Sequence, residues 1–247
     1  MKLLRPEGLV PYSDAYTLMH DLADQRFRDE IPDTLILLEH PPVYTVGKRS
    51  DPSHILWAKQ QIEAAGAELH DVDRGGSVTF HGPGQLVGYP IIDLGPTPDV
   101  VGYVRMLEEV VIRACACADA GVEGLGRNPI NAGVWAGDRK VCAIGVRVTM
   151  ARVTLHGFAL NCTTDLSWYD AIVPCGLTDT GVTTLSILAG HQVTVDEMAP
   201  LVARQFEVVF GAGVDLRVDA ESALSSTFGA TPQIESVPRT EWDRTPA

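Results

Sequence analysis

The stretch RGGSVTFHGPGQLVGYP, Arg74 to Pro90, joins five glycines and two prolines to one arginine and one histidine, just ahead of the apolar pair Ile91-Ile92. Glycine adopts positive φ and lets backbone amides approach a ligand closely. Proline fixes the chain beside it and removes a donor. We therefore expect this segment to surround something small.

The segments around this stretch predict an α+β fold. Strands are expected at 34–38, 43–46, 68–73, 77–80, 86–94, 132–135, 139–149 and 152–161, and helices at 13–30, 58–67, 99–120 and 194–210. Strands cluster in the middle of the chain without a regular βα alternation, so we expect a mixed or antiparallel sheet with packed helices. Residues 163–183 read as irregular, and we expect one catalytic domain over 1–217 with a loose tail over 218–247.

Local signals refine these boundaries. Ser13 is predicted to cap the first helix, whose buried stripe holds Tyr16, Met19, Ala23 and Phe27. Gly121 is predicted to end the third helix, with Val104, Leu107, Val111, Ala114 and Ala118 buried. Gly137-Asp138 fits a type II′ hairpin turn. Thr194 and Glu197 form a capping box.

Composition restricts the class of protein. The chain has 247 residues, 45% of them hydrophobic, and a net charge of −13, which suits one core and makes nucleic acid a poor partner. We expect a cytoplasmic protein without a membrane span, because no apolar run is long enough and the start lacks a signal-peptide core. We expect a monomer, because the sequence shows no long apolar face that a partner would have to cover. Five cysteines, an odd number, are expected to be reduced thiols.

Two common kinds of site, a dinucleotide-binding loop and a metal site, are not supported by the spacing of their residues. Gly82, Gly84 and Gly88 lack the spacing of a dinucleotide loop, and a strand follows where a helix should begin. A metal site built from His81, Cys142, His156, Cys162 and Cys175 lacks ligand spacing, so we expect no metal and no cofactor.

Cys175 is the candidate nucleophile, because it stands in a loop between Pro174 and Gly176. An inert, partly buried thiol is an equally good interpretation from these residues alone. A nucleophilic role needs a partner for the thiolate, and His81, His156 and Lys140 are the candidates, with a Cys–His dyad as the default. These residues alone favour a solvated hairpin residue as the interpretation of Lys140, and a hydrogen-bonded structural residue as that of His156.

Four motifs in order carry a family resemblance. They are Arg74-Gly75-Gly76-x-x-Thr79-x-His81-Gly82-Pro83-Gly84-Gln85-Leu86, Gly137-x-x-Lys140-Val141-Cys142-Ala143-Ile144-Gly145, His156-Gly157-Phe158-Ala159-Leu160-Asn161 and Pro174-Cys175-Gly176-Leu177. Together, over about 35–210, they resemble the lipoyl (octanoyl) transferases of the biotin/lipoate protein ligase fold superfamily. Thr183-Thr184-Leu185 departs slightly from the family pattern.

The resemblance implies both a reaction and a site. Family members move an octanoyl group from acyl carrier protein to a lysine of apo lipoyl domains, in 2-oxoacid dehydrogenase complexes and the glycine cleavage H protein. It implies Cys175 as nucleophile and Lys140 as its partner, which replaces the default Cys–His dyad. The implied substrate-binding residues are Arg74, Gly75, Gly76, Ser77, Val78, Thr79, Phe80, His81, Ala143, Ile144, Gly145, His156, Gly157, Phe158 and Ala159. Oxyanion donors are expected among the backbone N–H groups of 75–76 or 143–145.

Docking of acidic partners needs a local basic rim, because the chain itself is acidic. Its candidates are Lys48, Arg49, Arg74, Arg127, Arg139, Arg147 and Arg152. Rival functions are an ATP-dependent lipoate–protein ligase of the same fold, a non-catalytic acyl- or carrier-binding protein, and a cysteine hydrolase.

Overall fold

The computed structural model describes residues 1–117, 120–129, 131–173 and 181–211. Its main sheet runs in the order β1 (Lys2–Leu4), β2 (Thr34–Leu38), β6 (Gln85–Ile91), β10 (Thr154–Asn161), β9 (Arg139–Val148), β8 (Gly133–Ala136) and β7 (Gly126–Arg127), with β11 (Gly181–Val182) beside β9. β1 pairs parallel with β2 and β11 parallel with β9, while the other pairs are antiparallel. The sheet is therefore mixed, as the sequence predicts.

A second, smaller sheet has the order β4 (Glu68–Asp71), β3 (Val43–Val46) and β5 (Val78–His81). The stretch 74–90 connects the two sheets, because β5 belongs to the small sheet and β6 to the main one. A turn joins them, in which Gln85 N–H donates to the Gly82 carbonyl. This stretch therefore fixes how the two sheets meet.

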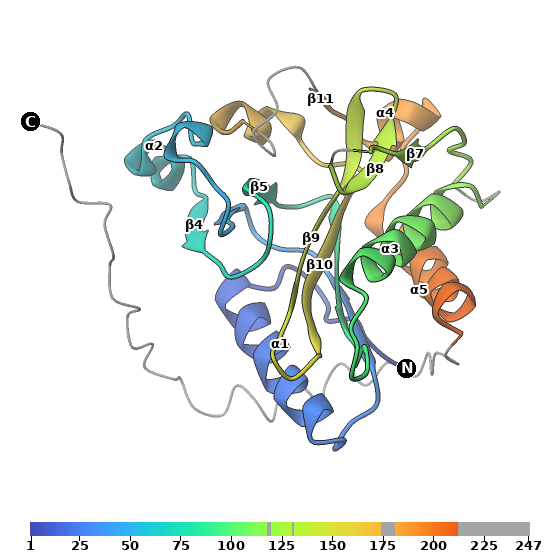
Figure 1. The fold of residues 1–247 in the computed structure, drawn as a ribbon. Coiled ribbons are helices and arrows are strands. Elements are labelled where there is room, and N and C mark those ends of the chain that lie inside the picture. Colours follow the sequence, from blue (N-terminus) through green and yellow to red (C-terminus); the bar gives the residue numbers. More distant parts are fainter. Residues whose placement is uncertain (118–119, 130, 174–180, 212–247) are drawn as a thin grey trace, which may run out of the picture.

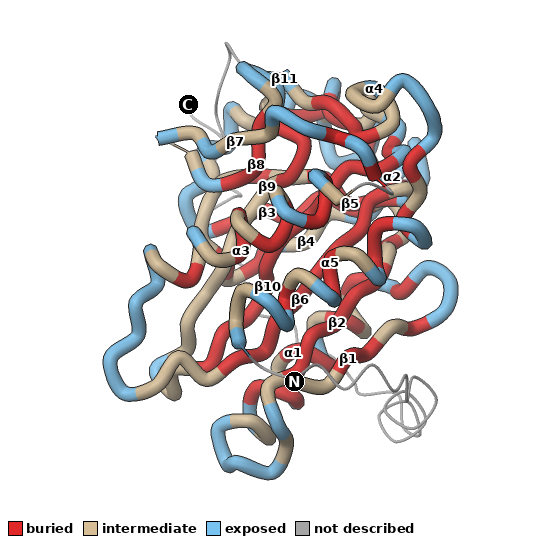
Figure 2. Tube along the Cα trace, turned by 90° about the vertical axis from the view of Figure 1, so that its right-hand side faces the viewer, coloured by how far each residue is buried: buried red, intermediate tan, exposed pale blue. Residues whose placement is uncertain are grey.

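Helices cover both faces of the main sheet (Figure 1). α3 (Val100–Cys115) and α5 (Val195–Phe210) pack together over one face, in a core with Leu107, Val141 and Phe206. α1 (Tyr12–Phe27) covers the other face through Leu18 and Met19. Figure 2 shows the central strands buried between these layers. The short helices are α2 (Lys59–Ala64), α4 (Leu185–Ala189), and the 3-10 turns η1 (Pro52–His54) and η2 (Leu166–Ala171).

Several local predictions are confirmed. Thr194 caps α5 in a reciprocal box with Glu197. Gly137 has φ 63° in the two-residue turn between β8 and β9, and Asp138 is not among the residues with positive φ, as a type II′ turn requires. The four described cysteines are free thiols, and none of the described helices has both the length and the apolar composition needed to cross a membrane.

Other local predictions are wrong. Ser13 does not cap α1, because the helix already begins at Tyr12, after Pro11, whose fixed φ suits a helix entry. Phe27 is 51% exposed at the last position of that helix. Gly121 does not cap α3, which ends at Cys115 with Ala116 as its cap.

Some predictions differ in their bounds or cannot be checked. β4 stops at Asp71 and β10 starts at Thr154, while the region 163–183, read as irregular, contains η2 and β11. Ala118 and residues 212–247 lie outside the described part of the chain. The division into a domain over 1–217 and a tail over 218–247 therefore stays a prediction.

Candidate active site

A pocket lies where the loop after β4 meets β9 and β10. It encloses about 500 Å³, part of it open to solvent. Its walls are Tyr12, Arg74, Gly75, Gly76, Ser77, Val78, Thr79, His81, Tyr89, Ala143, Ile144, Gly145, His156, Gly157, Phe158 and Ala159. The structure thus brings together three motifs that are far apart in the sequence. That these residues bind a substrate stays a prediction.

Phe80 is the one predicted binding residue that does not line this pocket. Its neighbours on β5, Val78, Thr79 and His81, all line the pocket, but Phe80 does not. The Phe80 ring is fully buried in another cluster, stacked on Trp168 at 5.4 Å between centroids and edge-on to Tyr169. Its role is to pack the small sheet.

Arg74 shapes the loop that forms one wall. Its Nη2 donates to the Thr45 carbonyl at 2.6 Å and to Thr45 Oγ1 at 2.8 Å, and its Nη1 donates to the Ser77 carbonyl at 2.7 Å. Gly76 takes φ 89°, a conformation that suits glycine. Gly75 N–H donates to the Val146 carbonyl at 3.0 Å, which attaches the loop to β9. That N–H is therefore committed, and the expectation that it serves an oxyanion is wrong.

His81 is buried and neutral. Its Nδ1–H donates to Gln85 Oε1 at 2.9 Å, so Nε2 carries the lone pair. Burial lowers the pKa of His81 well below its ordinary value, and the neighbouring His40 and Arg74 add to the effect. An imidazole in this state orients other groups and does not carry positive charge.

His156 is held in a strained backbone conformation on β10. Its φ is 58°, in the left-handed region that non-glycine residues rarely adopt, and its side chain is buried. Nε2–H donates to Asp73 Oδ1 at 2.7 Å. Burial lowers the pKa of His156 to about 3, helped by the charges of Arg74, His20 and Arg147. The Asp73 carboxylate would favour the protonated form of His156, but it is already paired with Arg147.

The turn Gly82–Gln85 is hydrogen-bonded to neighbouring segments and does not line the pocket. The Gly84 carbonyl accepts from Cys162 N–H, Thr163 N–H and Thr164 Oγ1 at 2.9–3.0 Å, and Gly84 N–H donates to Glu39 Oε2 at 2.7 Å. Gln85 Nε2 donates to Asn161 Oδ1 at 2.9 Å, and Asn161 Nδ2 donates to the Thr183 carbonyl at 3.1 Å. The second half of the opening stretch therefore ties β5, β10 and β11 together.

Tyr12 and Tyr89 line the pocket without being predicted. Tyr12 begins α1 and stacks on His81 with ring centroids 6.4 Å apart, and Tyr89 lies on β6 with its hydroxyl 2.8 Å from His40 Nε2. Val10 O accepts from His40 Nδ1, so the tyrosine hydroxyl donates to Nε2. The sequence carries no motif at Tyr12, because its place depends on how α1 packs.

Lys140 is buried at the start of β9. Its Nζ lies 4.7 Å from the centroid of the Trp135 ring, and its carbonyl accepts from Thr183 N–H at 2.9 Å. It lies three positions before Ala143 of the pocket wall, which is about 10 Å along a strand. The interpretation of Lys140 as a solvated hairpin residue is therefore wrong: it is 6% exposed.

The proposed partner of Lys140, Cys175, lies outside the described residues. After that segment the chain resumes at β11, whose Val182 pairs with Lys140. Two buried polar atoms in this region, Trp135 Nε1 and Thr183 Oγ1, have no hydrogen-bond partner among the residues that the structure describes. Such orphaned groups cost about 1–3 kcal/mol each and are rare in ordinary cores.

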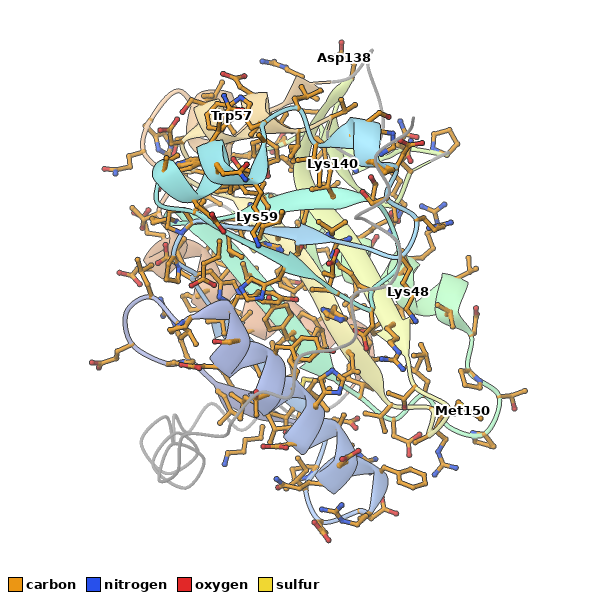
Figure 3. The ribbon with its side chains drawn as sticks, turned by 90° about the vertical axis from the view of Figure 1, so that its left-hand side faces the viewer. Lys48, Trp57, Lys59, Asp138, Lys140 and Met150 are labelled. Atoms are coloured by element: carbon orange, nitrogen blue, oxygen red, sulfur yellow. The ribbon has the colours of Figure 1, made fainter. Side chains whose placement is uncertain are left out.

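The expected basic rim is not continuous. Arg127 pairs with Glu108 and Glu109, Arg147 with Asp73, and Arg152 with Asp93. Figure 3 shows Lys140 and Met150 at opposite ends of the β9–β10 hairpin, so Arg139 and Arg152 are about 30 Å apart along it. Lys48 and Arg49 remain exposed beside the pocket loop, where their N–H groups donate to the carbonyls of Arg74 and Gly76. A single rim of seven cations is therefore wrong.

A metal centre finds no support in the described chain, where no group of three His, Cys, Asp or Glu side chains is arranged to hold an ion. Of the five residues considered for such a site, His81 and His156 bind Gln85 and Asp73 instead. Burial raises the pKa of Cys142 and Cys162, so both remain protonated thiols.

Comparison with known proteins finds relatives that match most of the chain. The family model described as "Lipoyl protein ligase A/B catalytic domain" matches residues 11–207. An octanoyltransferase from Acidothermus cellulolyticus is 50% identical over 225 residues, covering 89% of this chain and 97% of that protein.

Two solved structures share the fold. A crystal structure of lipoate-protein ligase A bound with ATP superposes with a TM-score of 0.72 at 17% identity, covering 92% of each chain. An apo biotin protein ligase from Aquifex aeolicus has a TM-score of 0.50 at 11% identity, over 85% of this chain and 69% of that one. The predicted α+β fold of biotin and lipoate protein ligases is thereby confirmed.

Proposed function

The chain belongs to the lipoyl protein ligase A/B catalytic-domain family, as an octanoyltransferase, and from this premise we propose that it moves an octanoyl group from acyl carrier protein to a lysine of apo lipoyl domains through a thioester on Cys175. The receiving domains are those of 2-oxoacid dehydrogenase complexes and the glycine cleavage H protein. The enzyme acts as a monomer in the cytoplasm.

The observation that carries the proposal is a pocket lined by residues of three family motifs, with the buried Lys140 on β9, the same strand that supplies Ala143, Ile144 and Gly145 to the pocket wall. Val78, Ile144 and Phe158 give this pocket apolar walls. Six or seven buried methylenes contribute roughly 5 kcal/mol at about 0.8 kcal/mol each. That energy selects the acyl chain and holds it, but it does not by itself speed the chemistry.

The first step forms the acyl-enzyme. Lys140 accepts the thiol proton of Cys175 or holds the thiolate as an ion pair. The sulfur attacks the octanoyl carbonyl, a new C–S bond forms, and the bond to the carrier sulfur breaks. The carrier leaves as a thiol with that proton. Exchange of one thioester for another is close to neutral in energy, so no ATP is consumed.

The second step transfers the acyl group to an amine. The target lysine attacks as a neutral amine, the C–S bond to Cys175 breaks, and an amide forms. Lys140, neutral at that moment, accepts the amine proton as general base. Amide formation from a thioester runs downhill, so this step is one-way. Neutral His81 and His156 line the pocket without placing a positive charge beside the acyl chain.

Mass spectrometry tests the covalent step directly. The protein is mixed with octanoyl-acyl carrier protein and then with an apo lipoyl domain. We expect an octanoyl adduct on Cys175 that disappears as the domain gains the acyl group. An active enzyme without that adduct would falsify the covalent mechanism. Release of free octanoate would indicate a hydrolase, and activity of Cys175→Ala with octanoate and ATP would indicate a ligase.

Lys140→Arg tests the base. Arginine keeps the charge but does not give up its proton, so we expect almost complete loss of turnover. Lys59→Arg is the matched control, because Lys59 is exposed on α2 and pairs with Glu63 (Figure 3). Wild-type turnover by Lys140→Arg would remove Lys140 from the mechanism.

A further inference from the structure

Glu108 is a fully buried carboxylate on α3 that lies outside the pocket. Its Oε2 accepts from Arg105 Nη1 at 2.7 Å and pairs with Arg127 Nε at 3.2 Å. Its Oε1 accepts from Gly133 N–H at 3.1 Å. Burying a charge is costly even when it is paired, so a carboxylate at this place calls for an explanation beyond packing.

Gly133, the residue that Glu108 holds, lies directly against Lys140. It has φ 137°, a conformation that L side chains rarely adopt. A Cβ added to Gly133 would lie 2.5 Å from the Cys142 carbonyl oxygen and 3.3 Å from Lys140 Cε. The stem of Lys140 therefore occupies the space that any side chain at 133 would need.

The strand that carries Gly133 is irregular at this point. Gly133 pairs with Ala143 and Val134 with Cys142, but Trp135 pairs with Lys140, so the register shifts between Val134 and Trp135. Such bulges re-aim side chains and weaken the ladder. The ladder alone does not fix Gly133 and Trp135, the two residues between which Lys140 is held.

A purely structural tether would not need Glu108. Arg127 on β7 already pairs with Glu109, the next residue of α3, at a half-exposed position. That pair joins the same strand to the same helix without burying a charge. What distinguishes Glu108 is its contact with Gly133 N–H.

We propose that Glu108 is a positioning residue, which holds Gly133 N–H and so sets the bulged start of β8 and the place of the Lys140 ammonium group. This rests on the proposed function, in which Lys140 moves the proton. Glu108 touches no reacting atom; it acts through Gly133.

Two substitutions separate this role from a structural ion pair. Glu108→Gln keeps an oxygen that can accept from Gly133 N–H but removes the charge that pairs with Arg105 and Arg127. Glu108→Asp keeps the charge but is one methylene shorter and does not reach Gly133. Glu109→Gln is the control, because it loses its ion pairs without touching Gly133.

The readouts are kcat, KM for the octanoyl carrier and the pH profile of single-turnover acyl transfer. A displacement of about 1 Å can cost on the order of 100-fold in rate. We expect Glu108→Asp to lose kcat by that order, with KM unchanged and the acidic limb of the profile shifted. We expect Glu108→Gln and Glu109→Gln to stay within a few-fold of wild type, because the partner guanidinium groups of Arg105 and Arg127 are partly exposed and stay solvated when the carboxylate charge is lost.

The reverse order, with Glu108→Gln impaired and Glu108→Asp active, would overturn the proposal and leave an ion pair as the explanation. Should Glu108→Asp not fold, Glu108→Leu takes its place, because leucine offers no acceptor to Gly133 N–H and the partly exposed Arg105 and Arg127 stay solvated without the carboxylate. Wild-type kcat in Glu108→Leu then overturns the proposal. Wild-type activity of both variants, with Lys140→Arg inactive, removes Glu108 while the proposed function stands.

Discussion

At the residue scale, Arg74 shows how one side chain builds a wall. Its guanidinium donates to the backbone of Thr45 and Ser77, and it is 7% exposed. Arginine suits this task because it presents several donors in a rigid fork and stays charged when buried. The loop 74–77 is thereby fixed against β3 before any ligand enters. Lysine at this position could not make the same set of contacts.

Tyr12 is expected to limit the length of the acyl chain. Its buried ring lines the pocket and stacks on His81. Tyr12 is the first residue of α1, the helix that packs on β6 and β10. Tyr12→Ala should open space there, so decanoyl and dodecanoyl donors should gain relative to octanoyl. Each added methylene contributes about 0.8 kcal/mol, or roughly fourfold in kcat/KM.

The measurement is kcat/KM over a series of acyl carriers from hexanoyl to dodecanoyl. Tyr16→Ala is the control, since Tyr16 neighbours Tyr12 but does not line the pocket. An unchanged preference in Tyr12→Ala would place the limit elsewhere.

The sequence predicted the pocket residues of the motifs well, because each motif is local. Gly157 marks a close backbone approach that leaves no room for a side chain, Gly75 and Gly145 mark tight ones, and such glycines are visible in a sequence. Tyr12 and Tyr89 were missed, because their place depends on how α1 and β6 pack. Phe80 does not line the pocket, because a motif does not tell which buried cluster a side chain joins.

Gly157 should not tolerate a side chain. A Cβ there would lie 2.1 Å from the Gly88 carbonyl oxygen, which is backbone and cannot move aside. We expect Gly157→Ala to lower the free energy of unfolding by at least about 3 kcal/mol, measured by urea denaturation. Gly126→Ala is the control, because an added Cβ there meets nothing within 4 Å, and its effect should stay below about 0.5 kcal/mol. Equal effects would show that the β6–β10 contact is not tight.

At the element scale, the long strands and helices follow from periodicity, whereas the short elements do not. β9 and β10 are long runs rich in apolar residues that pair with each other from Thr154 with Val148 to Leu160 with Cys142, so their sequences predict them. β1, β7, β11 and α4 have only two to five residues, and each strand forms because a distant partner is already in place. The helix starts differ in the same way. Thr194 forms a complete capping box with Glu197, so the sequence predicts the start of α5. At α1 the sequence suggests Ser13 as the cap, but the helix begins earlier, at Tyr12, directly after Pro11.

Substitution of Thr194, which caps α5, and of Ser13, which was expected to cap α1 but does not, makes that difference measurable. Thr194→Ala removes a side chain that accepts from Glu197 N–H, so we expect a loss of about 1 kcal/mol in the free energy of unfolding. Ser13→Ala lies within α1 and removes no cap, so its effect should be within about 0.5 kcal/mol. Urea titrations of both variants give the comparison. A loss at Ser13 equal to that at Thr194 would contradict the assigned start of α1.

At the scale of the whole molecule, the pocket sits where two sheets and α1 meet, and the site depends on buried groups from all of them. His40 and His81 lie beside Tyr12 on α1, and His156 lies on β10 against Asp73. Burial keeps all three histidines neutral, since each has a lowered pKa. The junction of the layers is therefore sensitive to acid.

This arrangement predicts a loss of stability on acidification. The pKa of His40 is lowered to about 4 and that of His156 to about 3, whereas an unfolded histidine titrates near 6.5. As pH falls below about 6.5, these histidines become protonated in the unfolded chain, whereas they stay neutral in the folded chain. The free energy of unfolding therefore falls. At pH 5 each such histidine lowers it by about 2 kcal/mol, at 1.36 kcal/mol per pH unit. Above pH 7 this effect vanishes.

His156→Asn isolates one histidine of the set. Asparagine tolerates the left-handed backbone at this position and does not titrate. The difference in the free energy of unfolding between pH 7.5 and pH 5 should therefore shrink by about 2 kcal/mol relative to wild type. His191→Asn, at an exposed position, should leave that difference unchanged. If both variants keep the wild-type difference, the acid sensitivity comes from groups other than the buried imidazoles, and the neutral state assigned to His156 in the pocket wall would have to be abandoned.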